Sequence, residues 1–165
     1  MQRTVWIVLA LVLGTAAATI VATSPLLPAT VAAHFDRRGA ANGWMTRDAY
    51  TLFMGAFAVG IPLLIVTITS AVARVAPGTL NIPNRKYWNT PERRAIAIAK
   101  VTTSTVWLAI LVSAFIVGVH WLLIRANTGA SAHLPNDAFY ALLGIFAVAI
   151  VGWAVALFAR FRRPG

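Results

Sequence analysis

The sequence predicts an all-α integral membrane protein with four transmembrane helices in a bundle. Of its 165 residues, 59% are hydrophobic and 11% are charged, and the apolar residues occur in long blocks. A helix rises about 1.5 Å per residue, so roughly 20 apolar residues cross a bilayer core about 30 Å thick while pairing every backbone group. Four stretches meet this requirement and make one domain: residues 4–23, 49–73, 101–124 and 137–159.

The positive charge lies in the segments between these stretches and predicts their orientation. The formal net charge is +10, from 14 Lys and Arg against 4 Asp and Glu. Cytoplasmic segments of membrane proteins retain Lys and Arg, and the N-terminus, loop 2 (residues 74–100) and the tail hold most of them. We therefore expect both termini and loop 2 in the cytoplasm, with loop 1 (24–48) and loop 3 (125–136) on the outer side of the membrane. The first group is Arg3, Arg74, Arg85, Lys86, Arg93, Arg94, Lys100, Arg160, Arg162 and Arg163, and the second is Arg37, Arg38, Arg47 and Arg125.

The same distribution bears on partners. Basic residues that flank apolar helices are typical of contact with anionic lipid headgroups, and these residues offer no basic groove for nucleic acid. We therefore expect membrane lipids, including anionic headgroups, as partners and no nucleic acid.

The first stretch imitates a secretory signal, because Arg3 precedes an apolar centre and the small residues 14–18. The apolar run nevertheless continues through Ala22, which favours an uncleaved helix. A cleaved signal would leave loop 1 on the same side of the membrane.

Loop 1 is a polar, turn-rich island between two apolar runs. Pro25 and Pro28 end the first helix, and residues 30–36 suit a short extended segment. Gly39 and the pair 42–43 supply positions for positive φ, which predicts a tight fold-back. The second helix then starts with Thr46 as N-cap and Asp48 in its first turn.

Glycine and proline mark the second and fourth stretches. Gly55 and Gly60 in the second, and Gly144 and Gly152 in the fourth, predict close approach of a neighbouring backbone. Pro62 predicts a kink near the middle of the second span.

The end of loop 2 carries a helix start. Thr90 suits the N-cap, Pro91 the first position and Glu92 the first turn. The helix so begun is apolar over residues 95–99, so we expect it to lie in the interface before it enters the membrane as the third span.

Three polar residues are weak candidates for a metal site: His34, Asp36 and His120. His and Asp are ordinary ligands, and an ionisable group at membrane depth is a functional candidate. The alternatives are that Asp36 pairs with Arg37 or Arg38 in a turn, and that His120 reaches the interface near Arg125. The sequence therefore predicts no catalytic residue, no metal and no cofactor.

Other chemistries lack their residues. With no Cys there is no disulfide and no thiolate site, and no phosphate-binding loop or nucleophile elbow occurs. The four acidic residues fall in loops or at helix ends, which argues against a proton-coupled transporter.

Two motifs resemble a known family. Residues 28–44, Pro-Ala-Thr-Val-Ala-Ala-His-Phe-Asp-Arg-Arg-Gly-Ala-Ala-Asn-Gly-Trp, resemble the opening motif of a bacterial membrane domain of unknown function. That domain also begins the SdpI-type immunity proteins, which protect cells against a peptide toxin and take part in signalling. Residues 81–88 with 91–94 resemble a loop of its short stand-alone members. The additional C-terminal helical region of the SdpI-type proteins is not found here.

These observations favour a non-enzymatic protein that recognises a protein or peptide partner through outer loop 1, as immunity and signalling proteins do. The alternatives are an accessory subunit of a larger membrane complex and a small membrane enzyme or metal-binding protein. The expected recognition residues are His34, Phe35, Asp36, Gly39, Asn42, Gly43 and Trp44, and the expected cytoplasmic docking residues are Asn84, Arg85, Lys86, Tyr87, Trp88, Arg93 and Arg94.

Overall fold

The computed structural model describes residues 2–79, 81–129 and 131–162. Within these ranges, four helices are long and apolar enough to cross a membrane, which confirms the predicted multi-pass architecture. Arg163, one of the basic residues of the predicted cytoplasmic tail, lies outside the described residues. The four helices are α1 (Gln2–Thr23), α2 (Arg47–Val75), α4 (Pro91–Asn127) and α5 (Asn136–Arg160).

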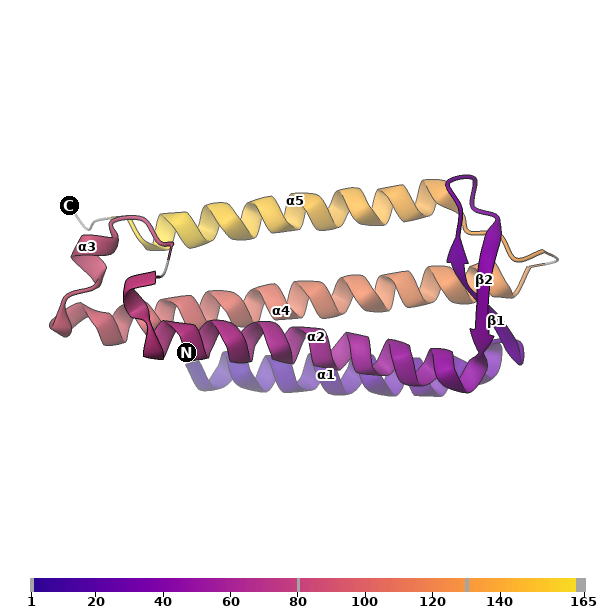
Figure 1. Ribbon diagram of the computed structural model, residues 1–165, viewed down its shortest axis with the longest axis horizontal. Coiled ribbons are helices and arrows are strands. Elements are labelled where there is room, and N and C mark those ends of the chain that lie inside the picture. The colour runs from indigo at the N-terminus through magenta and orange to yellow at the C-terminus, as the bar shows by residue number, and fades with distance from the viewer. Residues whose placement is uncertain (1, 80, 130, 163–165) are drawn as a thin grey trace.

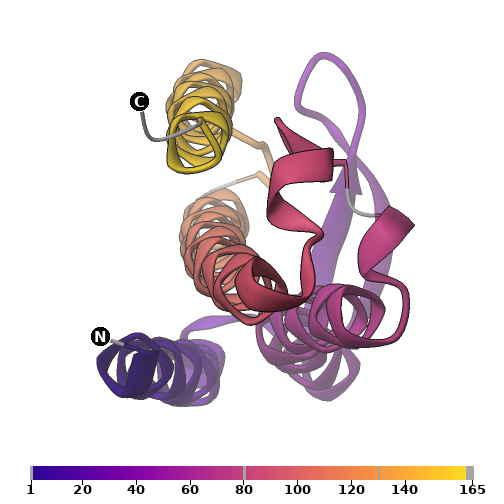
Figure 2. The same cartoon turned by 90° about the vertical axis from the view of Figure 1, so that its left-hand side faces the viewer.

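Helix α4 is the centre of the bundle. It packs against each of the other three long helices, and the end-on view in Figure 2 places it between α5 and the pair formed by α1 and α2. Its seam with α2 is built from residues that recur about every fourth position on one face of α2, as helical periodicity requires. The buried residues of α2 are Tyr50, Met54, Ala58, Pro62, Val66, Ser70 and Ala73.

The helical glycines do not serve the packing role predicted for them. A Cβ added at Gly55, Gly60, Gly144 or Gly152 would meet no atom within 4 Å. Close contact of α2 with α4 occurs instead at Ala58, whose carbonyl accepts a hydrogen bond from the Ser113 hydroxyl at 3.1 Å. The glycines therefore line open faces of their helices.

Helix α4 begins where the sequence predicts but needs no separate interfacial helix. Thr90 occupies the N-cap position, although its hydroxyl makes no cap hydrogen bond. Residues 95–99, expected to lie in the interface, continue directly into the span as part of one 37-residue helix. At about 1.5 Å per residue this helix is longer than a bilayer core is thick, so its first turns extend beyond that core.

Loop 1 forms a β-hairpin, so the fold is not purely α-helical. Strand β1 (Thr30–Phe35) pairs antiparallel with β2 (Ala41–Thr46), and Figure 1 shows both strands lying across one end of the bundle. Gly39 has φ 84° in the connecting turn, as predicted. The pair 42–43, also expected in the turn, lies within β2 because the Asp36–Ala40 segment already closes the hairpin.

Different elements lie at the two ends of the bundle. One end, called here the hairpin end, holds the hairpin and the connection from α4 to α5. The other end, called here the α3 end, holds the short helix α3 (Arg85–Trp88), the start of α1 and the end of α5. Loops 1 and 3 thus share one end, as the predicted topology requires.

Candidate functional site

The hairpin is fastened to the bundle by the last residue of α4. The side-chain amide of Asn127 accepts a hydrogen bond from the Ala32 N–H at 2.7 Å and donates one to the Ala32 carbonyl at 3.0 Å. The amide therefore pairs with β1 as a neighbouring strand would, using both halves of its hydrogen-bonding capacity. This contact sets the position of β1 over the end of α4.

The turn of the hairpin is fastened to loop 3. The Leu134 N–H donates to the Gly39 carbonyl at 2.9 Å, and the Asn136 side chain donates to the Arg37 carbonyl at 3.1 Å. Gly39 is buried there, and a Cβ on it would lie 2.6 Å from the Leu134 carbonyl oxygen. Glycine is required at this position both by its positive φ and by this close approach.

These two attachments enclose one side of an open pocket of about 250 Å³, called here the hairpin pocket. Its walls come from β1, the last turns of α4, loop 3 and the first turns of α5. Polar groups and aromatic rings meet in it, as in many recognition sites. The lining residues are Ala33, His34, Phe35, Asp36, Val119, Leu123, Leu134, Asn136, Phe139 and Tyr140.

The structure divides the seven predicted recognition residues into two groups. His34, Phe35 and Asp36 line the hairpin pocket, and Gly39 fastens the turn behind it. Gly43 lies against the His34 ring, since a Cβ on it would stand 3.0 Å from His34 Cδ2. The other two, Asn42 and Trp44, are exposed on β2 outside the pocket lining, and 58% of Trp44 is accessible.

Asp36 stabilises the turn through backbone groups. Its carboxylate Oδ1 accepts hydrogen bonds from the N–H groups of Arg38 at 2.8 Å and Ala40 at 2.9 Å. Asp36 thus serves the turn, as one alternative expected, but it binds backbone amides and not the Arg37 or Arg38 side chain. The side chain still borders the pocket, so it gives the opening a negative charge.

His120 has a structural role in the core beneath the hairpin. It is fully buried, its Nδ1 lies 2.9 Å from the Tyr50 hydroxyl, and its Nε2 lies 2.7 Å from the Thr23 hydroxyl. The Thr23 hydroxyl also donates to the Thr19 carbonyl at 2.6 Å. Because a hydroxyl has one hydrogen, Thr23 then accepts from Nε2–H, and Nδ1 accepts from Tyr50.

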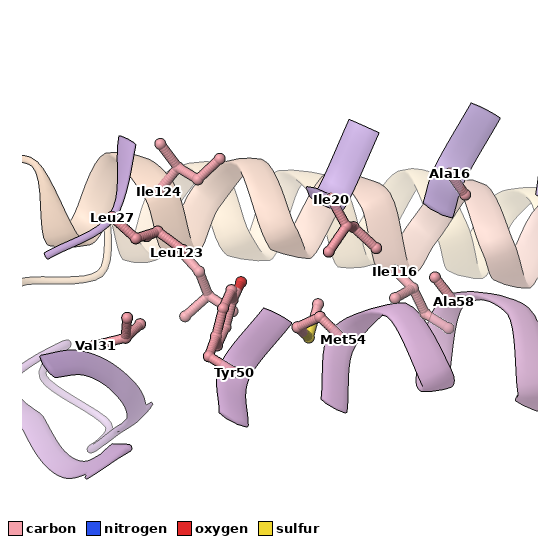
Figure 3. Packing of buried hydrophobic residues seen from close by; sticks show 10 residues of the cluster. All are labelled: Ala16, Ile20, Leu27, Val31, Tyr50, Met54, Ala58, Ile116, Leu123 and Ile124. Atoms are coloured by element: carbon pink, nitrogen blue, oxygen red, sulfur yellow. The ribbon is translucent and has the colours of Figure 1, made fainter. Parts of the chain in front are cut away.

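One neutral tautomer of His120 thus satisfies this chain of polar groups, called here the Tyr50–His120–Thr23 relay, which joins α2, α4 and α1. Figure 3 shows Tyr50 among the apolar side chains around it, from Ile20 and Val31 to Leu123. The alternative for His120 was that its side chain reaches the membrane interface near Arg125. The ring is instead enclosed by protein and bonded to Tyr50 and Thr23.

The three weak metal candidates lie in different surroundings. His120 is enclosed in the core, whereas His34 and Asp36 are exposed at the hairpin pocket. Within the described ranges, no three His, Cys, Asp or Glu residues gather as a metal site would need. His34, Asp36 and His120 therefore do not form one ligand set.

Part of the expected docking surface on loop 2 is used inside the molecule. Trp88 is buried, and its Nε1 and the Asn84 side chain each donate to the Phe161 carbonyl at 3.0 Å. Tyr87 stacks under the Arg93 guanidinium, 4.2 Å from its ring centroid. Asn84 and Trp88 therefore hold loop 2 against the end of α5. Arg85, Lys86 and Arg94 are the exposed cations of the set.

The fold and the hairpin pocket together define a multi-pass membrane protein with an open recess at one end of its bundle. Residues 10–66 match the model of a family described as a domain of unknown function, DUF1648. The match spans most of α1, the hairpin and the first two thirds of α2, and so includes the loop 1 motif. No curated protein and no solved structure matches the chain.

Proposed function

We propose that the protein is a non-enzymatic inner-membrane protein of a bacterium that recognises a peptide or protein partner through the hairpin pocket. One observation carries the proposal: the His34–Asp36 segment of the loop 1 motif lines this pocket together with residues from α5. A motif that served only the turn would have no reason to border an open recess. Recognition residues concentrate on loops that a rigid scaffold positions.

The lining fits a side chain that is apolar along its length and polar or basic at its tip. Phe35, Leu134 and Phe139 supply the apolar wall, while Asp36 and Tyr140 supply polar groups. An extended peptide with one such anchor residue has the matching chemistry, because anchors in pockets supply most of the affinity at small interfaces.

The family resemblance supports the same role. The loop 1 motif lies inside the matched segment and resembles the motif that opens the SdpI-type immunity proteins, which protect cells against a peptide toxin. On this basis we further propose that the partner is a peptide or protein outside the cell and that binding it leads to immunity or signalling.

We expect a photocrosslinking amino acid at Tyr140, which is 59% exposed, to capture the partner in living cells. His34→Ala should reduce the captured product about tenfold, the equivalent of roughly 1.4 kcal/mol of binding. The product is identified by mass spectrometry, and the same crosslinker at Val148, on an open face of α5, is the position control.

The same measurement separates the pocket from the outer face of the hairpin. Trp44→Ala should leave capture near the wild-type level, since Trp44 does not line the pocket. Loss of capture with Trp44→Ala and not with His34→Ala would contradict the pocket and place recognition on β2.

A second candidate function, an accessory subunit of a larger complex, is favoured by α5. This helix packs on α4, and none of its described residues is fully buried. The accessory role requires a partner in fixed stoichiometry after purification in mild detergent. A protein that runs alone would exclude it.

We also propose that the hairpin end faces outward and that both termini are cytoplasmic. Most of the described basic residues belong to the start of α1, the segment from the end of α2 to the start of α4, or the end of α5, and cytoplasmic segments are those that retain Lys and Arg. Because the chain has no Cys, Arg38→Cys and Lys86→Cys each introduce one exposed thiol. A membrane-impermeant reagent should label Arg38→Cys in intact cells and Lys86→Cys only after lysis; the reverse pattern would invert the topology.

A further inference from the structure

A second recess lies between α4 and α5 near the α3 end, away from the hairpin pocket. It is an open groove of about 300 Å³ with a mostly apolar lining, called here the α4–α5 groove. Its lining residues are Ser104, Trp107, Leu111, Ala149, Gly152, Trp153, Ala156, Leu157 and Arg160. Apart from Ser104 and Arg160, this lining suits a hydrocarbon chain.

A cation reaches into one end of the groove. Arg160, in the last turn of α5, donates from Nη1 to the Ser104 hydroxyl at 2.9 Å, which draws its side chain over the groove. The Trp153 ring is fixed nearby, because its Nε1 donates to the Ser104 carbonyl at 2.7 Å. A guanidinium has five N–H donors in a planar fork that suits phosphate oxygens.

A second basic residue, Lys100, binds the backbone at the end of α5. Lys100 precedes Ser104 by one helical turn, and its Nζ donates to the Arg160 carbonyl at 2.9 Å. No carboxylate occurs among the described residues that line the groove. Lys100 also lies over the Trp88 ring, 4.1 Å from its centroid, so Arg160 is the cation that lines the groove and Lys100 adds positive charge beside it. Arg160 uses one of its five N–H donors on Ser104 and keeps the others for an anion.

The aromatic residues indicate the depth of the groove in the membrane. Trp107 and Trp153 line it within about two turns of the cations, and Trp is enriched at the level of lipid headgroups. The apolar part, with Leu111 and Ala149, continues from there toward the bilayer centre. Cation, aromatic belt and apolar groove follow one another in the order of a phospholipid's phosphate, glycerol and acyl chain.

We propose that the α4–α5 groove binds one anionic phospholipid, with its phosphate at Arg160 and Lys100 and an acyl chain along Gly152. Basic residues scattered beside the helices attract anionic lipids without holding any one molecule. A site that combines a cation with an apolar groove is expected to hold one lipid through purification. A free phosphate would use the cations and leave the apolar groove unfilled, so a lipid is the occupant that fits both parts. The site is independent of the hairpin pocket.

The groove has a clean steric test at Gly152. A side chain there meets no protein atom within 4 Å of its Cβ, so Gly152→Leu fills the groove without disturbing the packing described around it. Gly144→Leu is the matched control, because Gly144 has the same open surroundings on the same helix and lies outside the groove lining.

The measurement is native mass spectrometry of the purified protein offered equal amounts of phosphatidylglycerol and phosphatidylcholine. We expect wild type and Gly144→Leu to retain one phosphatidylglycerol, and Gly152→Leu to retain about tenfold less, a loss near 1.4 kcal/mol. Arg160→Gln should retain both lipids equally, and it tests the headgroup contact even if Gly152→Leu fails to fold. Equal retention of the two lipids by wild type, or unchanged retention by Gly152→Leu, would overturn the proposal.

Discussion

Replacement of His120 by alanine is expected to lower the free energy of unfolding by about 3 kcal/mol, as large-to-small changes in a packed core do. The imidazole is fully buried at the meeting point of three helices. Its removal leaves a cavity and deprives the Tyr50 hydroxyl of its partner. A buried hydroxyl without a hydrogen bond costs about 1–3 kcal/mol, and this cost adds to that of the cavity.

The measurement is reversible unfolding of the purified protein in mixed micelles, followed by the loss of helical signal. His133→Ala is the control, because His133 is an exposed histidine at the same end of the bundle. It should change the free energy of unfolding by less than about 0.5 kcal/mol, the usual range for surface substitutions. Equal losses for the two variants would contradict the structural role of His120.

A double-mutant cycle isolates the hydrogen bond of the relay from the cavity. Tyr50→Phe alone should cost about 1 kcal/mol, since it removes one hydroxyl and keeps the ring in place. In the His120→Ala background the same change should cost nothing or stabilise the protein, because the hydroxyl no longer has a partner to lose. Additive costs would show that the Tyr50–His120 contact contributes no energy.

The sequence predicts the spans well because a membrane-spanning helix needs about 20 consecutive apolar residues, which the sequence shows directly. Each predicted stretch falls inside one long helix, with Thr46 capping α2 through the Ala49 N–H at 3.3 Å. Hydropathy and caps are local properties, so they can be read without knowing the neighbours. The extension of α4 back to Pro91 as one helix follows the same local start signal at Thr90.

The glycines of α2 and α5 were predicted wrongly because their role depends on direction around the helix. Met54 lies on the seam with α4, and Gly55 is the next residue. Successive residues of a helix point about 100° apart, so Gly55 points away from α4. Composition shows that small residues are present but not toward which helix they point. Ala58, four residues after Met54, is the small residue on the seam.

The candidate site was predicted in part, and the missing members come from distant segments. The motif predicts His34, Phe35 and Asp36, whereas Asn136, Phe139 and Tyr140 join them only through the packing of loop 3 against the hairpin. Asn127 gives a weak signal as a polar residue that ends an apolar helix. Its pairing with Ala32, 95 residues earlier, is a tertiary contact that no local pattern contains.

Loop 2 shows the opposite error, in which a conspicuous motif serves packing. Trp88 and Asn84 resemble exposed recognition residues in the sequence because they stand among Arg and Lys. In the structure both bind the Phe161 carbonyl at the end of α5, which lacks a helical partner there. An aromatic residue in a basic loop can therefore supply the hydrogen bond that a carbonyl at a helix C-terminus lacks.

Substitution of Gly39 by valine is expected to release the hairpin turn from loop 3 and to cost about 3 kcal/mol in the free energy of unfolding. A positive φ costs a non-glycine residue roughly 1–3 kcal/mol, and a Cβ would lie 2.6 Å from the Leu134 carbonyl oxygen and 2.8 Å from His133 Cε1. The backbone oxygen cannot move without breaking the Leu134–Gly39 hydrogen bond. The turn and loop 3 must therefore separate, which removes one wall of the hairpin pocket.

Hydrogen exchange of the amides measures this release directly. In Gly39→Val the Leu134 and Ala40 N–H groups should lose protection, while Ala32 keeps it, because Asn127 holds β1 independently. Gly129→Ala in the same loop is the control, since its added Cβ meets only the Ser131 carbonyl at an ordinary 3.5 Å. If the amides of the Gly39→Val variant were as protected as those of wild type, the Gly39–Leu134 contact would not hold the turn in place. The Asn127–Ala32 attachment would then be sufficient to position the hairpin.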